Sequence, residues 1–250
     1  MRKWEDLPAE MRNVEVRYYY ELLCKKSFSL KLKRAFDVVV SAIMLVCLSW
    51  LFLILAVVIK IDSPGPVFYR QERVTRYGKK FKIHKFRTMV NNADKKGTLV
   101  TVKNDSRVTR VGQMIRKYRL DEISQLIDVF EGTMSFVGTR PEVPKFVREY
   151  TPVMMATLLL PAGVTSEASV LYKDEDRLLD GAEDVDKVYV KKVLPGKMYY
   201  NLKSIEKFSF LGELGTMVKT VFAILGKDYP ADVKGEKKFA EKNKAKGKTK

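Results

Sequence analysis

The stretch VVVSAIMLVCLSWLFLILAVVI, from Val38 to Ile59, is the longest uncharged run in the chain and decides how the fold has to be built. Its 22 residues match the roughly 20 that an α-helix needs to cross the hydrocarbon core of a bilayer. A secretory signal peptide is a poor alternative, because a long and mostly polar segment precedes the run and no small-x-small cleavage site follows it. We therefore expect the run to insert into a membrane and to remain in the mature protein.

Both flanks of this run are basic. Before it stand Lys25, Lys26, Lys31, Lys33 and Arg34, and after it come Lys60, Arg70, Arg73, Arg76, Lys79, Lys80 and Lys82. Basic flanks favour the cytosolic side, so a helix that enters the bilayer and returns to the same face satisfies both ends. The break then needs local hydrogen bonds, for instance from the hydroxyls of Ser41 or Ser49. An ordinary single-pass anchor is the alternative.

Composition limits the remaining choices. The chain has 250 residues, of which 46% are hydrophobic, and its net charge of +17 predicts an anionic partner: nucleic acid, a phosphorylated metabolite or an anionic membrane surface. Cys24 and Cys47 are too few for a disulfide framework. A lone His84, which we interpret as a packed or partly exposed strand residue, leaves no His/Cys cluster with the spacing of zinc ligands.

The pattern after the apolar run predicts an α+β fold that is mostly helical. Ser63 to Pro66 ends the membrane helix, and alternation in 67–69 and 80–84 around a turn at 76–79 predicts a β-hairpin. Helical spacing follows in 120–130 and 211–225, the second of which could pack in the core or lie on the bilayer. The predicted units are a polar, basic extension (1–33), a membrane helix and turn (34–66), a catalytic domain (67–231) and a disordered Lys-rich tail (232–250).

The segment from Arg116 to Glu122 gathers the residues best suited to chemistry. Arg116 and Arg119 stand beside the adjacent carboxylates of Asp121 and Glu122 at the start of the predicted amphipathic helix. Arginine binds phosphate oxygens, and a carboxylate can act as a nucleophile or hold Mg²⁺. The structural alternative is that acidic residues in a first helical turn only complement the helix dipole. Lys85 and Arg140 are further cations, each of which could equally be solvated surface.

Six blocks, read in order, resemble the bacterial sugar transferase family of small monotopic polyprenyl-phosphate phosphoglycosyl transferases. The blocks are Lys33-Arg34-Ala35-Phe36-Asp37, Ser63-Pro64-Gly65-Pro66-Val67-Phe68, Gln71-Glu72-Arg73, Lys85-Phe86-Arg87-Thr88-Met89, Leu120-Asp121-Glu122-Ile123-Ser124-Gln125-Leu126, and Met134-Ser135-Phe136-Val137-Gly138 with Arg140-Pro141-Glu142. In the family a Ser-Pro pair breaks the re-entrant membrane helix. Here the matching pair is Ser49-Trp50.

The resemblance implies a chemistry and a set of roles. A UDP-sugar and polyprenyl phosphate are the implied substrates, and Asp121 is the implied nucleophile, which forms a covalent phosphosugar intermediate and releases UMP. Glu122 is the implied ligand of Mg²⁺. The resemblance also implies that Arg116, Arg140, Lys85 and Pro141 contact phosphate or nucleotide, and that Ser49 marks the break of the membrane helix.

The resemblance further implies a place in the cell and in metabolism. The catalytic domain is expected on the cytosolic face of the bacterial inner membrane, surrounded by its lipids and by amphipathic interfacial helices, at the first membrane step of surface glycan synthesis. No nucleic acid is expected as a partner, and a homodimer stays open. The rival hypothesis is a membrane-anchored basic protein that binds anionic lipid or nucleic acid without catalysis. The sequence does not reveal which UDP-sugar is used or which glycan is primed.

Overall fold

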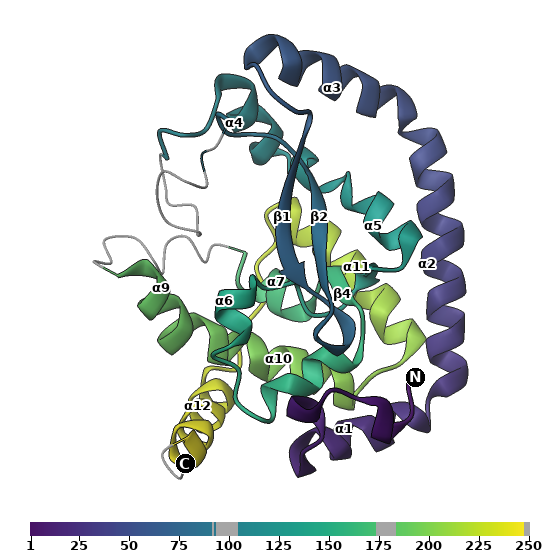
Figure 1. Cartoon of the computed structure of the whole chain (residues 1–250), viewed down its shortest axis with the longest axis vertical. Helices are drawn as coiled ribbons and strands as arrows, with labels where there is room; N and C mark the ends of the chain where they lie inside the picture. The colour runs from purple at the N-terminus through teal and green to yellow at the C-terminus, as the bar shows by residue number, and fades with distance from the viewer. Residues whose placement is uncertain (92, 94–104, 174–183, 248–250) are drawn as a thin grey trace.

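A computed structural model describes residues 1–91, 93, 105–173 and 184–247. Two long helices form an arm, α2 (Ser27–Cys47) and α3 (Ser49–Asp62), and the remaining elements make a mixed domain beside it. Figure 1 shows α2 along one side of the molecule and α3 turning across its end. The expectation of a mostly helical α+β fold is confirmed by the strands and helices described below.

The arm is bent where α2 meets α3. Leu48 leaves the helical conformation between them, the two axes differ by 61°, and the Ser49 hydroxyl donates to Val46 O at 2.8 Å. No single described helix is long and apolar enough to cross a bilayer, but the bent pair reaches that length and composition together. Large apolar side chains lie exposed along the pair: Val39, Ile43, Val46, Trp50, Leu53, Ile54, Val57, Val58 and Ile61.

The predicted hairpin is confirmed, and it is longer than the sequence pattern indicated. Strand β1 (Phe68–Val74) pairs antiparallel with β2 (Lys80–Phe86), so that Phe68 faces Phe86 and Val74 faces Lys80. A 3-10 turn, η3 (Arg76–Gly78), joins the strands with Tyr77 and Gly78 at positive φ. The hairpin carries Lys85 and His84 toward the centre of the domain.

The segment expected to be one helix over 120–130 is divided. Helix α4 (Arg110–Lys117) ends before Arg119, whose φ of 52° is left-handed, and a 3-10 turn η5 (Leu120–Glu122) precedes α5 (Gln125–Glu131). A left-handed residue cannot continue an α-helix, so α4 ends there, and Asp121 and Glu122 lie in the 3-10 turn η5, which Ile123 and Ser124 separate from α5. The expectation that the carboxylates begin the amphipathic helix is therefore wrong.

A second small sheet lies behind this turn. Strands β3 (Met134–Val137) and β4 (Ala162–Thr165) pair in parallel, and the connection between them contains α6 (Pro144–Val147) and the 3-10 helix η6 (Met154–Leu159). Gly163 of β4 lies against Gly138, the residue that follows β3. A Cβ on Gly163 would lie 2.2 Å from Gly138 N, so the two chains come this close because neither residue has a side chain. Helix α7 (Glu167–Leu171) follows β4 directly.

Helical segments enclose the rest of the domain. They are α1 (Val14–Cys24) after two 3-10 turns, η1 (Trp4–Asp6) and η2 (Ala9–Met11), then α9 (Val185–Val188), the π-helical η7 (Tyr189–Val193), α10 (Leu194–Glu206) and α11 (Phe210–Ile224). The open question about 211–225 is answered against core packing, because Leu211, Val221 and Leu225 are 77%, 57% and 76% exposed. One face of α11 is thus an apolar surface.

The C-terminal segment departs from the sequence-based expectation. Residues Val233–Gly247 form a helix, α12, that packs on α10, with the ring centroids of Phe239 and Tyr199 5.9 Å apart. The prediction of a disordered tail over 232–250 is wrong for this helix, because a few residues anchor it although most of its side chains are polar. Residues 248–250 lie outside the described part of the chain.

Candidate active site

Two carboxylates and two cations meet at the turn η5. The Arg140 guanidinium contacts Glu122 at two points, with Nη2 2.7 Å from Oε1 and Nη1 3.1 Å from Oε2. The Lys85 Nζ lies 3.3 Å from Glu122 Oε1 and 4.0 Å from Asp121 Oδ2. Both oxygens of Glu122 are therefore engaged, whereas Asp121 meets Lys85 only at long range. Residues 85, 121, 122 and 140, which the sequence singled out separately, form one cluster.

Lys85 is held in this cluster by its neighbour in the strand. The His84 backbone amide and its ring Nδ1 both reach the Asp128 carboxylate of α5, at 2.9 and 2.8 Å. Ser124 Oγ, between η5 and α5, donates to His84 O at 3.0 Å. These contacts fix β2 against η5 and α5, so that Lys85 faces the two carboxylates.

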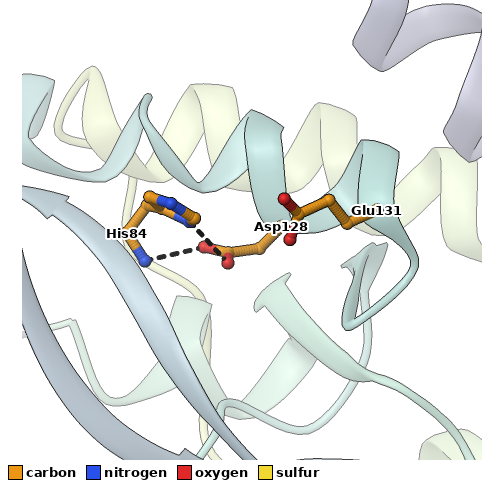
Figure 2. Close-up of side chains that lie close together, drawn as sticks. All are labelled: His84, Asp128 and Glu131. Atoms are coloured by element: carbon orange, nitrogen blue, oxygen red, sulfur yellow. Dashed lines mark hydrogen bonds and ion pairs between the residues drawn. The ribbon is translucent and has the colours of Figure 1, made fainter.

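His84, Asp128 and Glu131 place ligand atoms within 4.8 Å of one another. Figure 2 shows the three side chains. The contacts of His84 argue against a metal centre there. Its Nδ1 is engaged by Asp128, which accepts with both oxygens, and its Nε2 lies against the Arg70 guanidinium. Neither ring nitrogen of His84 is thus left to hold a metal ion. The interpretation of His84 as a packed strand residue is confirmed by its 8% exposure.

Arg140 is positioned by the parallel strand pair. It follows β3, and its Nη1 donates to Val164 O of β4 at 2.9 Å. The next residue does not line the cluster: Pro141 is buried, and its carbonyl accepts a hydrogen bond from Arg73 Nη1 at 3.0 Å. The geometry therefore gives Pro141 a backbone contact behind the site and supplies no sign of the phosphate contact that the resemblance implied.

Arg116 approaches the cluster from α4. Its Nε donates to Thr88 Oγ1 at 2.8 Å, which ties the end of α4 to the segment after β2. Thr88 O also accepts from Thr109 N at the start of α4. The Arg116 side chain lines two cavities, described below, and both are also lined by Lys85 and Asp121.

Burial and neighbouring charges move the pKa values of the two carboxylates in opposite directions. Burial raises the pKa of Asp121, and Glu122 adds to this, although Lys85 and Arg116 oppose it. Burial acts in the same direction on Glu122, but Arg140 and Lys85 outweigh it and hold the pKa of that carboxyl well below its usual range. Burial lowers the pKa of Lys85 against the pull of Glu122 and Asp121. Adjacent groups with pKa values moved in opposite directions are typical of catalytic sites.

Three cavities meet at these carboxylates. The hairpin cavity, about 410 Å³, lies between β1, β2 and α4 and reaches Asp121. The basic cavity, also about 410 Å³, contains both carboxylates. The apolar groove, about 560 Å³, begins at Glu122 and Arg140 and continues between α2, α5 and α11, where it is lined by Met44, Ile123, Leu126, Phe136, Met217, Val221 and Ile224.

Several residues of the basic cavity escaped prediction as site residues. They are Lys117, Arg119, Ser169, Tyr172, Lys173 and Lys197. Arg119 was recognised as a cation of the motif but was given no role. Lys117 ends α4, Ser169 belongs to α7, Tyr172 and Lys173 follow α7, and Lys197 belongs to α10. The last four are distant from the motif in sequence, where single Ser, Tyr or Lys residues carry no signal. Lys197 is buried, and its Nζ donates to Tyr189 OH at 3.1 Å.

Comparison of the sequence with known proteins shows to which family the chain belongs. The profile of the bacterial sugar transferases matches residues 28–227, a region that runs from the second residue of α2 to beyond the end of α11. The chain belongs to the bacterial sugar transferase family. The resemblance noted in the sequence is thus confirmed, and the cluster around Asp121 lies inside the matched region.

Relatives in this family give the context. A UDP-N-acetylgalactosamine-undecaprenyl-phosphate N-acetylgalactosaminephosphotransferase of Aeromonas hydrophila is 35% identical over 78% of this chain and 44% of its own length. A UDP-glucose:undecaprenyl-phosphate glucose-1-phosphate transferase of Escherichia coli is 37% identical over 56% of this chain and 31% of its own. The exopolysaccharide production protein ExoY of Sinorhizobium fredii is 31% identical over 77% and 84%. The chain spans less than half the length of the first two.

Proposed function

We propose that the protein transfers a sugar phosphate from a UDP-sugar to polyprenyl phosphate and releases UMP. The observation that carries the proposal is the position of the carboxylate pair, at which a basic cavity suited to a diphosphate meets an apolar groove suited to a lipid chain. Relatives that are named for nucleotide-sugar and undecaprenyl-phosphate substrates support the same pair of substrates.

Asp121 is the proposed nucleophile. One of its carboxylate oxygens attacks the β-phosphorus, the bond from that phosphorus to the oxygen shared with the α-phosphorus breaks, and UMP leaves with that oxygen. A phosphate oxygen of the polyprenyl phosphate then attacks the same phosphorus, and the bond to Asp121 breaks to restore the carboxylate. The looser contacts of Asp121, compared with those of Glu122, support this division of labour.

The cations around the turn are proposed to hold the phosphates. Arg116 and Lys85 line both the hairpin cavity and the basic cavity, as Asp121 does, so they can contact the donor before and after the bond is broken. Val164 O and Glu122 hold the Arg140 guanidinium in one orientation, so it can bind a phosphate group at a fixed place. Arg119, the left-handed residue before η5, lines the same cavity, and we include it among the phosphate-binding cations.

The donor set fits a magnesium ion. A carboxylate offers about four acceptor positions, and Glu122 uses three of them for Arg140 and Lys85, so one position remains on Oε2. Mg²⁺ is usually held by one or two carboxylates together with substrate phosphates. We therefore propose Glu122 as its ligand. When bound, the ion would neutralise charge on the diphosphate.

The apolar groove is the proposed site of the polyprenyl chain. It lies between α2 and α11, whose outer faces carry exposed apolar side chains. We propose that these faces and α3 enter one leaflet of the bacterial inner membrane from the cytosolic side, with the bend at Leu48 returning the chain to that side. A lipid acceptor can then reach the carboxylates without leaving the membrane.

A panel of UDP-sugars, each mixed with the purified full chain in detergent, Mg²⁺ and polyprenyl phosphate, tests the function. We expect UMP to appear with at least one sugar and to disappear with Asp121→Asn. The panel also identifies the sugar. A basic protein that only binds anionic ligands would release UMP from none of them, and that result would contradict the proposal.

A further inference from the structure

The C-terminal helix reaches the candidate active site through one carboxylate. Glu236 of α12 accepts hydrogen bonds from two tyrosines, Tyr172 OH at 2.8 Å and Tyr200 OH at 2.7 Å. Tyr200 belongs to α10, on which α12 packs, whereas Tyr172 follows α7. Glu236 therefore connects the helix to two different elements of the domain.

Of these two tyrosines, Tyr172 alone lines the basic cavity. The other described lining residues are Ser169 and nine charged side chains, among them Asp121 and Glu122. Tyr172 is thus the aromatic surface in the described wall of that cavity. An aromatic ring is suited to pack against an uncharged ring of a ligand, while the cations hold its phosphates.

The packing of α12 on α10 requires two glycines. A Cβ on Gly196 of α10 would lie 1.9 Å from Tyr172 OH and 3.1 Å from Glu236 Oε2. A Cβ on Gly235 of α12 would lie 2.3 Å from Tyr199 OH. Neither helix could approach the other so closely with a larger residue, so the bond between Tyr172 and Glu236 depends on both glycines.

The start of α12 is also fixed. Asp232 Oδ1 accepts from Gly235 N at 3.0 Å, the bond of an N-cap, and Asp232 N donates to Tyr200 OH at 2.6 Å. Figure 1 shows α12 at the end of the molecule opposite α3, away from the helix proposed to enter the membrane. The residues of α12 also follow the region that matches the family profile, which ends at 227.

We propose that Glu236 is a positioning residue for the donor site: it holds Tyr172 in the wall of the basic cavity, against which an uncharged ring of the nucleotide sugar packs. The proposal rests on the proposed function, because that function supplies the donor. It makes α12 part of the catalytic unit. Tyr172 would contact the ligand, and Glu236 would act through it.

The test compares four variants in the full chain: Glu236→Ala, Tyr172→Phe, Tyr172→Ala and Tyr200→Phe. Loss of the bond to Glu236 in the first two should raise the KM for the UDP-sugar about tenfold and leave kcat nearly unchanged. Tyr172→Ala should raise it further, because the ring itself is lost. Tyr200→Phe is the control for a loosened α12, since it removes the other bond to Glu236 and the acceptor of Asp232 N but no cavity residue, and it should raise KM less than Tyr172→Phe does.

Calorimetry with UMP and with the UDP-sugar, on chains that also carry Asp121→Asn and so do not turn the donor over, shows which ring packs on Tyr172. Weaker binding of both ligands to Tyr172→Ala assigns the uracil ring, and weaker binding of the UDP-sugar alone assigns the sugar. Unchanged binding of both would overturn the proposal. An equal rise of KM in Tyr172→Phe and Tyr200→Phe would also overturn it, because the effect would then come from the docking of α12 in general.

Amide hydrogen exchange examines the same contact without turnover. Glu236→Ala should accelerate exchange over 167–171, where Val170 N donates to Ser166 O, and Tyr200→Phe should do so less. Unchanged exchange in Glu236→Ala would overturn the positioning role. A wild-type chain that releases no UMP would instead contradict the proposed function, so the two failures are distinguishable.

Discussion

Arg140 and Glu122 form a two-point ion pair, with Nη2 2.7 Å from Oε1 and Nη1 3.1 Å from Oε2, although eighteen residues separate them in the sequence. The pair joins the end of β3 to the turn that carries Asp121. Because Arg140 is also fixed by Val164 O, the position of Glu122 is determined by the parallel strand pair.

Arg140→Lys should lower kcat/KM about tenfold or more, because lysine keeps the charge but cannot make the two-point contact. Steady-state release of UMP measures this. Lys145→Ala is the control: it breaks an ion pair with Asp186 whose lysine side chain is 57% exposed, and such pairs contribute little. Equal activity of Arg140→Lys and the wild type would contradict the role of the pair.

The pH dependence of kcat/KM should be bell-shaped. Burial raises the pKa of Asp121, so as pH falls this nucleophile is protonated at a higher pH than an ordinary aspartate, and activity is lost there. Burial lowers the pKa of Lys85, so as pH rises its positive charge is lost before that of an ordinary lysine. The apparent pKa values of the two limbs belong to the whole cluster, which also contains Glu122 and Arg140, and not to single residues.

Lys85→Arg should move the alkaline limb of this profile to higher pH, because a guanidinium stays protonated throughout the range. The acid limb should remain. An alkaline limb that is unchanged in Lys85→Arg would show that another group is responsible for it.

Gly65→Ala should destabilise the protein more than Gly78→Ala. A Cβ on Gly65, where φ is +133°, would lie 2.0 Å from Arg87 Nη1, and Arg87 cannot move away without losing the carbonyls of Pro64 and Ser63 at the end of α3. Gly78 also has positive φ, but no atom of the described residues lies within 4 Å of its Cβ position. Strain alone should cost about 1 kcal/mol at Gly78, whereas strain and collision together should cost at least about 3 kcal/mol at Gly65. Thermal unfolding in detergent checks the difference, and equal losses would contradict the account of Arg87.

Both flanks of the membrane arm should face the cytosol. Single cysteines at the exposed positions Lys25 and Glu72, in a chain whose Cys24 and Cys47 are replaced by serine, should resist a membrane-impermeant maleimide in intact cells and react after lysis. Labelling of either position in intact cells would contradict the re-entrant arrangement and favour a single span.

Much of the site could be predicted from the sequence because its residues lie in short local motifs. The hairpin follows from alternation, and Asp121 and Glu122 are adjacent. The left-handed Arg119 could not be predicted, since φ > 0 is uncommon for any residue other than glycine and an arginine carries no signal for it. The interpretation of 232–250 failed for a related reason: Glu236 and Phe239 anchor α12, but in the composition of the segment they are outnumbered by lysines.

The roles of the two carboxylates differ in a way that substitution can separate. Asp121→Asn should abolish release of UMP, because an amide is a poor nucleophile at phosphorus. Glu122→Gln should slow turnover severely and weaken its dependence on Mg²⁺, because an amide is a poorer ligand for a hard cation and also loses the ion pair with Arg140. Both variants should keep the fold, since they preserve side-chain size. Equal residual activity of the two variants would contradict the division of labour.

The most direct measurement is intact-protein mass spectrometry after the chain is mixed with its UDP-sugar and Mg²⁺ in the absence of polyprenyl phosphate. The account predicts UMP release and an adduct with the mass of a phosphosugar, mapped by proteolysis to Asp121 and missing in Asp121→Asn. If UMP appears only when polyprenyl phosphate is present and no adduct forms, transfer is direct, and Asp121 is a base or a metal ligand instead of the nucleophile.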